Sequence, residues 1–510
     1  MARETCPAML MIASPPPPDS ASSVTGVCRL SCHRPATFAL SRTFVHAVFG
    51  FEAGDGGLSG WSFPAGKTYN SGLHSPNRCG GGKQGERACK SPDLAGRHMI
   101  NHMTSKHGIV HLSGAEESTL CGRQRGGLSA ADQVVDGDAT ITCVGCFNRL
   151  HYFQLWKHVN ETLECVRADH GLPAALSLLE RQQFDKGFIQ DDLKSVQRYR
   201  LSHPIDRSRY YGIQFNPKRA LRHLGAGRSV PPPGETNLNG GCYLCPENVR
   251  WQQRGIEVGY DIKVNDSEYV AWMNPFPILP THTTIAARNH QAQSWIRTSA
   301  TQSDERIRSV LKDLLKLASE LPGFMGFYNG DGAGATIPGH FHFQFLRRRE
   351  GQEPFALERA AARGMGNRIH HEHGSDSFII RDYPITAVYF SGTDEYVIRG
   401  AVSWVQRWAE FYKESMALSA NIICCVDEEE PNRYHLYFVP RNKQVSHSIG
   451  MSGLVGGLEV LGELVFCTDA DKENLQRMTF ADVERVINGV EAPGVSEFLD
   501  TVMTTASVPG

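Results

Sequence analysis

The stretch that decides the fold runs from Gly326 to Arg349 and reads GFYNGDGAGATIPGHFHFQFLRRR. Its centre is His340-Phe341-His342-Phe343-Gln344. Because side chains of an extended strand alternate between two faces, the two histidines and the glutamine fall on one face and the phenylalanines on the other. The aromatic face can pack into a core, which leaves the polar face for chemistry. Taken alone, the stretch also fits an ordinary strand with two core histidines.

A glycine-rich bend precedes this strand and contains Gly330, Gly332 and Gly334. Such bends let backbone N–H groups approach and cradle phosphate oxygens. After the strand, the run from Arg347 to Arg349 could face phosphates, although a solvated run of charges is the favoured interpretation.

Composition excludes several classes of protein. The 510 residues include 52 Lys and Arg against 54 Asp and Glu, which argues against a general binder of nucleic acids or membrane surfaces. No uninterrupted apolar run approaches the roughly 20 residues of a membrane helix, and the N-terminus lacks the apolar core of a secretory signal. The 14 cysteines are scattered, which favours reduced thiols or metal ligands in a cytoplasmic protein.

The chain is expected to fold as an α+β protein with mainly antiparallel sheets and packed helices. Strands are predicted at 269–273, 281–287 and 324–328, with a helix from Ser303 to Leu321 between the last two. A similar rhythm returns at residues 386–390, 402–412, 421–426 and 434–439, so the C-terminal part is interpreted as a diverged copy of the first unit. Helical segments at 453–463 and 480–490 are expected to close the fold.

Four segments are predicted on this basis. Residues 1–130 lack apolar periodicity. They are interpreted either as a disordered extension or as the product of a start codon set too far upstream, with Met99 and Met103 as later starts. The segments are a disordered or mis-annotated extension (1–130), a helical entry segment (131–235), a first half that contains His340 and His342 (236–350) and a second, diverged half (351–510).

Cys242-Tyr243-Leu244-Cys245 is the second informative site. Two cysteines at this spacing can present both thiolates to one soft ion, usually Zn²⁺. A redox pair or two free thiols are the alternatives. A closed site needs four ligands, and His340 with either His282 or His290 could complete it. The other close pair, Cys143 and Cys146, is not followed by a second pair at zinc-finger spacing, so metal binding is not expected there.

Four motifs together resemble the galactose-1-phosphate uridylyltransferase family of the histidine-triad superfamily, which also contains nucleotide-sugar and dinucleoside polyphosphate phosphorylases. The pattern is most similar to an uncharacterised bacterial branch, over about residues 150 to 500. The motifs are CYLCPEN (242–248), MNPFPILPTHTTIAARNH (273–290), FYNG (327–330) and GHFHFQ (339–344).

The resemblance implies two halves of histidine-triad type and a two-step transfer. By position His342 is the nucleophile that attacks the α-phosphorus of a nucleotide sugar and forms a covalent nucleotidyl-histidine. Gln344 would then hydrogen-bond the phosphoryl oxygens. A neutral imidazole is a competent nucleophile near pH 7, and a covalent intermediate divides one difficult displacement into two easier ones.

The resemblance also implies a set of ligands. For Zn²⁺ it points to Cys242, Cys245, His290 and His340, with His282 as a rival for the histidine position. For substrate it points to Asn274 near the nucleotide, to Asn329, Gly330 and Thr336 near the phosphates, and to Glu459 at a hexose.

The sequence departs from this family in three places. Ala335-Thr336-Ile337 replaces the usual approach to the motif, Tyr437 stands where a histidine for a second metal is expected, and Leu458 replaces an aromatic residue. A second metal and galactose specificity are therefore not implied.

The leading hypothesis is a zinc-containing cytoplasmic nucleotidyltransferase whose partners are a nucleotide sugar and a sugar phosphate. Neither nucleic acid nor membrane is expected as a partner, and a homodimer is the expected assembly. The alternatives are a phosphorylase of a nucleotide sugar or a dinucleoside polyphosphate, in which inorganic phosphate is the acceptor, and a nucleotide-binding protein without turnover.

Overall fold

The computed structural model describes residues 144–221, 238–252, 257–293, 300–364, 368–372, 375–411, 418–447, 451 and 453–506, with the short strands β1 (His102–Thr104), β2 (Val110–Leu112) and β3 (Val134–Val135). The chain divides into two compact units, residues 1–75 and 76–510, and all described residues belong to the second. The hypothesis about residues 1–130 therefore falls outside the described residues, apart from β1 and β2.

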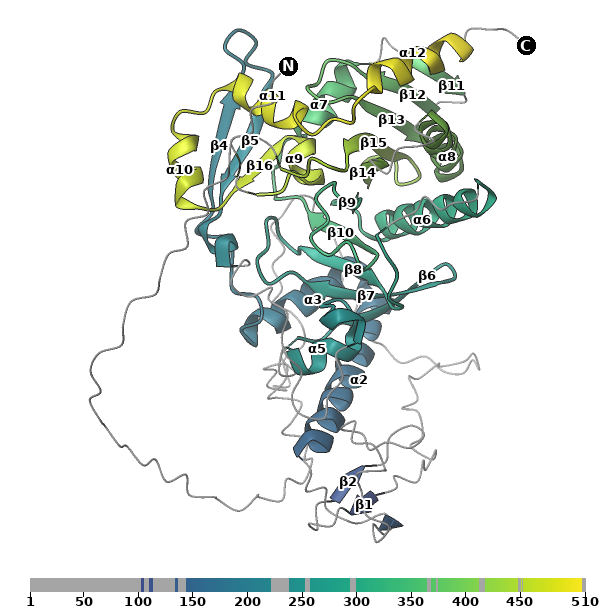
Figure 1. Ribbon diagram of the computed structural model, residues 1–510. Coiled ribbons are helices and arrows are strands. Elements are labelled where there is room, and N and C mark those ends of the chain that lie inside the picture. The colour runs from purple at the N-terminus through teal and green to yellow at the C-terminus, as the bar shows by residue number, and fades with distance from the viewer. Residues whose placement is uncertain are drawn as a thin grey trace, which may run out of the picture. The chain divides into compact units, whose positions relative to one another are not determined.

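A ten-stranded sheet forms the centre of the described chain (Figure 1), and every neighbouring pair of its strands is antiparallel. The strand order is β11-β12-β13-β15-β14-β9-β10-β8-β7-β6. The bounds are β6 Tyr260–Val264, β7 Ser267–Met273, β8 Thr283–Ala287, β9 Phe324–Asn329, β10 His342–Arg347, β11 Arg368–Glu372, β12 Ser375–Ile380, β13 Ala387–Gly392, β14 Leu418–Val426 and β15 Tyr434–Asn442.

The sheet consists of two halves with the same topology. In each half three strands lead into a long helix, α6 (Ala300–Glu320) or α8 (Asp394–Phe411), and two further strands follow. The spatial order 6-7-8-10-9 matches 11-12-13-15-14, and the halves join where β9 pairs with β14. The predicted α+β fold with mainly antiparallel sheets and packed helices is thus confirmed, and the two halves share one topology.

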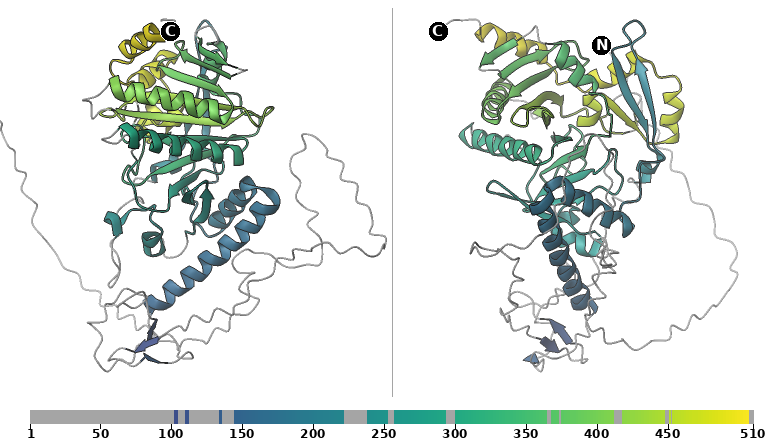
Figure 2. Two further views of the ribbon diagram at one scale, coloured as in Figure 1. Left: turned by 90° about the vertical axis from the view of Figure 1, so that its right-hand side faces the viewer. Right: turned by 180° about the vertical axis from the view of Figure 1, so that it is seen from behind.

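The two long helices cover one face of the sheet and contact each other, as Figure 2 shows. Among the described helices, none is long and apolar enough to cross a membrane. The remaining helices are α2 (Val144–His170), α3 (Leu172–Asp185), α5 (Pro246–Gln252), α7 (Ala356–Arg363), α9 (Gly457–Leu461), α10 (Asp469–Leu475), α11 (Phe480–Asn488), α12 (Val495–Ala506) and the 3₁₀ turns η2 (Pro217–Leu221) and η3 (Leu238–Gly241).

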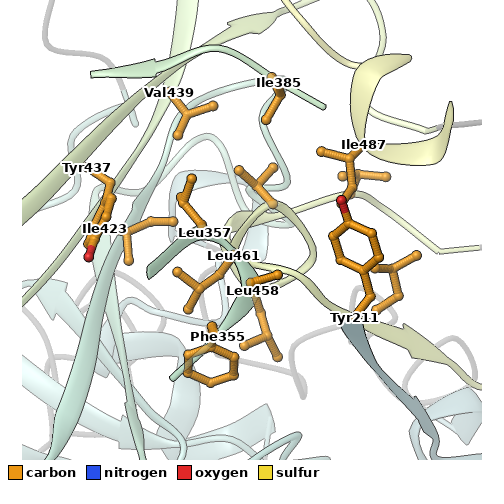
Figure 3. Close-up of a cluster of buried hydrophobic side chains, with 14 of the residues drawn as sticks. Tyr211, Phe355, Leu357, Ile385, Ile423, Tyr437, Val439, Leu458, Leu461 and Ile487 are labelled. Carbon is orange, nitrogen blue, oxygen red and sulfur yellow. The ribbon is translucent and has the colours of Figure 1, made fainter. Parts of the chain in front are cut away.

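The opposite face carries a large cluster of buried hydrophobic side chains (Figure 3). Side chains of α7 and α9 pack there between the sheet and a second, three-stranded sheet, which has the order β16 (Glu463–Phe466), β5 (Tyr210–Phe215) and β4 (Gln197–Ser202). Labelled examples are Leu357 of α7, Leu461 of α9, Ile423 of β14 and Tyr211 of β5. This layer joins the second half of the chain to the strands that precede the first half.

The alternation predicted for β10 places its two sets of side chains on opposite faces. Phe343 packs against Tyr269, whose hydroxyl donates to Asp313 of α6 over 2.7 Å, so the aromatic set faces the long helices. Leu346 belongs to the core on the other face, which is therefore also the face of His342 and Gln344.

Several elements were not expected from the sequence. They include β6, β11 and β12, which extend each half by further strands, and β16. The helix expected over 453–463 is only α9, because Gly462 ends it with a φ of 103° and β16 begins directly afterwards. A Cβ at Gly462 would lie 2.5 Å from Cβ of Ala356, so α7 blocks any larger residue there.

We predict that Leu461→Ala lowers the free energy of unfolding by about 2–5 kcal/mol, because it leaves a cavity between the two sheets. Leu461 has no exposed surface, whereas Ile205 at the β4–β5 hairpin is 88% exposed. Denaturant unfolding of both alanine variants tests this. Equal losses of stability would show that the layer formed by α9 is not part of the cooperative core.

Candidate active site and metal centre

Four donor side chains converge beside the first half of the sheet. Cys242 and Cys245 lie between η3 and α5, His290 follows β8, and His340 precedes β10. Their donor atoms all lie within 4.8 Å of one another. Sγ of Cys242 is 3.3 Å from Nδ1 of His340, and Sγ of Cys245 is 3.3 Å from Nδ1 of His290 and 3.6 Å from Nδ1 of His340. This Cys₂His₂ cluster could bind a metal ion.

The cluster fits a tetrahedral ion in two respects. Bonds of about 2.3 Å to sulfur and 2.0 Å to nitrogen imply donor–donor edges of roughly 3.5 Å, close to the separations found here. Nε2 of His340 lies 2.6 Å from the carbonyl oxygen of Ala287. Since a carbonyl only accepts, Nε2 carries the proton and Nδ1 offers its lone pair to the centre of the cluster.

The protonation of the two cysteines supports this interpretation. The hydrogen bond from Cys245 is the largest cause that lowers the pKa of Cys242 to about 4, against the opposing effect of burial. The contact with Cys242 raises the pKa of Cys245, so the pair shares one proton in the absence of a cation. The N–H of Leu244 and the amide of Asn239 point at the two sulfurs, each over 3.4 Å, as is usual for thiolate ligands.

His282, the rival ligand, is not part of this cluster. It is buried in the turn before β8, where its carbonyl oxygen accepts the N–H of Asn274 over 2.9 Å. Asn274 itself closes the same turn, because its side-chain oxygen accepts the N–H of Phe276 over 2.9 Å. Val270 of β7 lies level with Ala286 of β8 and with His342 of β10 in the pairing register. Asn274 follows Val270 by four residues, so its backbone lies roughly 13 Å further along the strand direction than the level of His342.

His342 begins β10 and is 2% exposed. Its Nδ1 lies 2.8 Å from the carbonyl oxygen of His340, so Nδ1 carries the proton and Nε2 the lone pair. Burial lowers the pKa of His342 to about 4, so the ring is neutral at physiological pH. Such an imidazole is a nucleophile without prior deprotonation. Gln344, half-buried on the same face of β10, pairs with Thr284 and Phe327.

Asn329 ends β9 and is held by the second half of the chain. Its side-chain oxygen accepts from the amide of Asn421 over 2.7 Å and from the N–H of Gly457 over 3.0 Å. With that oxygen engaged, the amide NH₂ of Asn329 is the group that can donate to a ligand. The N–H of Gly330 donates to the carbonyl of Ala420 over 3.0 Å.

The glycine bend is pressed onto the same second-half segments. Gly332 and Gly334 have φ values of 76° and 94°. A Cβ at Gly332 would lie 2.3 Å from the carbonyl oxygen of Lys443, and one at Gly334 would lie 2.4 Å from Cα of Gly456. Thr336, further along the bend, is exposed. The bend therefore needs glycine at both positions for conformation and for close approach.

Arg441 is a functional candidate that the sequence did not indicate. It has no exposed surface, and its guanidinium donates to the side-chain oxygen of Asn421 and to the carbonyls of Val455 and Val490, the latter two over 2.7 and 3.2 Å. Burial lowers the pKa of Arg441 to about 9, which still leaves it charged at neutral pH. The positive charge of the Arg441 guanidinium thus lies next to Asn421, which in turn contacts Asn329. In the sequence, this role was indicated only by the presence of a charged residue in an apolar strand.

Glu459 and the second half's own histidine have structural partners. A carboxylate oxygen of Glu459 accepts the N–H of Gly456 over 2.9 Å and so caps α9. His435 lies between the hydroxyl of Tyr389, at 2.6 Å, and the carboxylate of Asp427, at 3.0 Å. Among the described residues, the Cys₂His₂ cluster is the one group whose donor atoms converge on a metal position.

A family model matches part of the chain. Residues 178–347 match a family described as Domain of unknown function (DUF4922). The match spans about a third of the chain and includes both cysteines, the histidines of the cluster, His342 and Gln344. No curated protein matches the chain.

Three solved structures are similar to the chain. The yeast Ap4A phosphorylase is 16% identical, with 62% of this chain and 96% of that chain covered and a TM-score of 0.40. An Arabidopsis thaliana ADP-glucose phosphorylase is 14% identical (58% and 99% covered, TM-score 0.27), and a uridylyltransferase is 10% identical (57% and 98% covered, TM-score 0.26). The enzymes named are of the kinds that the sequence motifs resemble, but similarity at this level leaves the function to be argued from the side chains.

We predict that Gly334→Ala lowers the free energy of unfolding by at least about 1 kcal/mol, because the backbone conformation and the contact with Gly456 both exclude a methyl group. The matched control is Gly339→Ala in the same bend, where a Cβ would meet nothing within 4 Å. Denaturant unfolding measures both variants. A Gly334 variant as stable as the Gly339 variant would show that the bend is not held against the second half.

Proposed function

We propose that this protein is a nucleotidyltransferase that moves a nucleotidyl group from a nucleotide sugar to a sugar 1-phosphate through a covalent intermediate on His342. The observation that carries the proposal is the state of His342. Its Nδ1–H is bound to the carbonyl of His340, its ring is neutral, and one buried amide, that of Gln293, joins its backbone to that of Asn329 at the start of the glycine bend.

The first step is an attack of Nε2 of His342 on the α-phosphorus. A P–N bond forms, the bond from phosphorus to the bridging oxygen breaks, and a sugar 1-phosphate leaves. The ring becomes positively charged, and the carbonyl of His340, already bound to Nδ1–H over 2.8 Å, stabilises that charge. In the second step an oxygen of the acceptor phosphate attacks phosphorus, and the P–N bond breaks to restore neutral His342.

Two neutral amides support the transfer. Gln344 lies two residues from His342 on the same face of the sheet and can donate to phosphoryl oxygens without offering an acidic proton. The NH₂ group of Asn329 is directed away from its engaged oxygen and can donate to a second oxygen. Such donors are most effective where charge develops in the transition state.

We further propose that Cys242, Cys245, His290 and His340 hold a structural Zn²⁺. When bound, the ion supplies rigidity rather than Lewis-acid catalysis. His340 then presents the carbonyl that orients His342 from a fixed position.

A phosphorylase is the second candidate, and one observation favours it. Glu459, expected to bind a hexose, uses its carboxylate to cap α9. If that role is structural only, the acceptor site need not recognise a sugar, and inorganic phosphate could take the acceptor's place. The two functions differ in which acceptor discharges the nucleotidyl-protein.

The metal prediction is about one zinc per chain in the purified protein. Replacing both Cys242 and Cys245 by serine should remove it, since two of four ligands are lost. Cys165→Ser, at an exposed cysteine outside the cluster, is the matched control. Elemental analysis of the three proteins is the measurement, and zinc retained in the double variant would refute the ligand assignment.

The nucleophile prediction compares two neighbouring histidines by intact mass after brief mixing with a panel of nucleotide sugars. His342→Ala should form no nucleotidyl adduct but keep its zinc and its fold. His340→Ala should lose zinc and stability as well as activity, because a metal ligand cannot also attack phosphorus.

Gln344→Ala serves as the control for a change on the same strand face. It should still form the adduct, but more slowly by on the order of 10²–10³-fold, as for the loss of one transition-state donor. An adduct that forms equally well in His342→Ala and in the parent protein would contradict the proposed mechanism.

A further inference from the structure

The strands β9 and β10 separate just before the proposed phosphate ligand Asn329 and the proposed nucleophile His342. β9 and β10 pair from Phe324 with Arg347 to Phe327 with Gln344. The next two positions of this register would bring Phe343 opposite Tyr328 and His342 opposite Asn329. Both pairs are absent from the β9–β10 ladder, although β10 continues to pair with β8 there, with His342 opposite Ala286.

The side chain of Gln293 occupies the place of the missing pair. Its oxygen accepts the N–H of His342 over 2.7 Å. Its NH₂ group donates to the carbonyl of His342 and to the carbonyl of Asn329, each over 2.9 Å. The carboxamide thus forms hydrogen bonds with the N–H and C=O of His342 and with the C=O of Asn329. In directly paired strands these backbone groups would form hydrogen bonds across the ladder.

Gln293 is itself firmly placed. It is 1% exposed, its N–H donates to the carbonyl of Pro338 over 2.9 Å, and its carbonyl accepts the hydroxyl of Tyr328 over 3.2 Å. Pro338 belongs to the bend between Gly330 and His340, so one residue contacts β9, the bend and β10. A carboxamide suits this position because it is neutral and offers both two donors and an acceptor.

The Gln293 carboxamide sets the separation of β9 and β10 next to the proposed nucleophile. Directly paired strands would bring the backbones of His342 and Asn329 to about 5 Å between Cα atoms. The inserted amide holds them further apart, next to the bend whose N–H groups could receive phosphate. It also fixes the peptide of His342, on which the direction of the ring depends.

We propose that Gln293 is a positioning residue that holds the backbones of His342 and Asn329 at the separation needed for a phosphoanhydride to bind between their side chains. The inference rests on the proposed nucleotidyl transfer. Gln293 does not touch substrate. It acts through the peptide of His342 and the carbonyl of Asn329.

The test uses Gln293→Leu and the nearly isosteric Gln293→Glu, which keeps an acceptor for His342 but has no donors for the two carbonyls. The control is Gln183→Leu, which removes another fully buried glutamine, in α3. For each full-length, zinc-analysed protein, the rate of nucleotidyl-adduct formation is measured against the concentration of nucleotide sugar.

Both Gln293 variants should lose on the order of 10²-fold in the adduct rate at saturation, as expected for a misplaced nucleophile, while the half-saturating concentration changes far less. Zinc content should be unchanged. Gln183→Leu should be destabilised but should keep the parental rate at saturation. The glutamate variant provides the measurement if the leucine variant does not fold.

Two results overturn the inference in distinguishable ways. If the parent forms the adduct and a folded, zinc-loaded Gln293 variant forms it within about threefold of the parental rate, Gln293 only fills space. If the parent forms no adduct with any nucleotide sugar, the proposed function fails, and the positioning role fails with it.

Discussion

The hydrogen bond from Nδ1 of His342 to the carbonyl of His340 is the interaction on which the site depends. It links His340, a member of the Cys₂His₂ cluster, with His342, the proposed nucleophile, and only Phe341 lies between them in the chain. His340 turns its ring to the two cysteines, and its own peptide oxygen sets the tautomer of His342. Any contact that holds His340 in place therefore also directs the lone pair of His342. The hydrogen bond of 2.6 Å from Nε2 of His340 to the carbonyl oxygen of Ala287 is one such contact.

The second half of the chain has become a frame for the first. Its Asn421 and Arg441 hold Asn329 from behind, and Gly456 and Lys443 hold the glycine bend. Its own loop between β14 and β15, equivalent in topology to the bend, contains Asp427 instead of glycines.

The carboxylate of Asp427 accepts the N–H groups of Glu429 and Glu430 over 2.8 and 2.9 Å. In this loop an acidic side chain of the protein thus already occupies these backbone N–H groups. The equivalent N–H groups of the first-half bend could be offered to phosphate. In the proposed mechanism the chemistry therefore takes place on β9 and β10 of the first half, and the second half contributes support.

Features carried by local pattern were predictable from the sequence, and features created by long-range pairing were not. The alternation around His342 and the spacing of Cys242 and Cys245 are local, so the faces of β10 and the pairing of the two cysteines could be anticipated. The choice of His290 over His282 came only from the family resemblance, because the residues themselves left both histidines open. Gln293 and Arg441 look like ordinary polar residues in the sequence. Their roles arise only when strands distant in sequence, or a gap in their register, surround them.

The central claim is that the transferred group resides on His342, and its location can be read directly. Protein mixed with a nucleotide sugar is digested at alkaline pH, where a phosphorus–nitrogen bond to histidine survives, and the modified peptide is fragmented in a mass spectrometer. The proposed mechanism predicts the nucleotidyl mass on His342 alone. A nucleotidyl mass on any other residue, or turnover without a modified peptide at any time point, would contradict it.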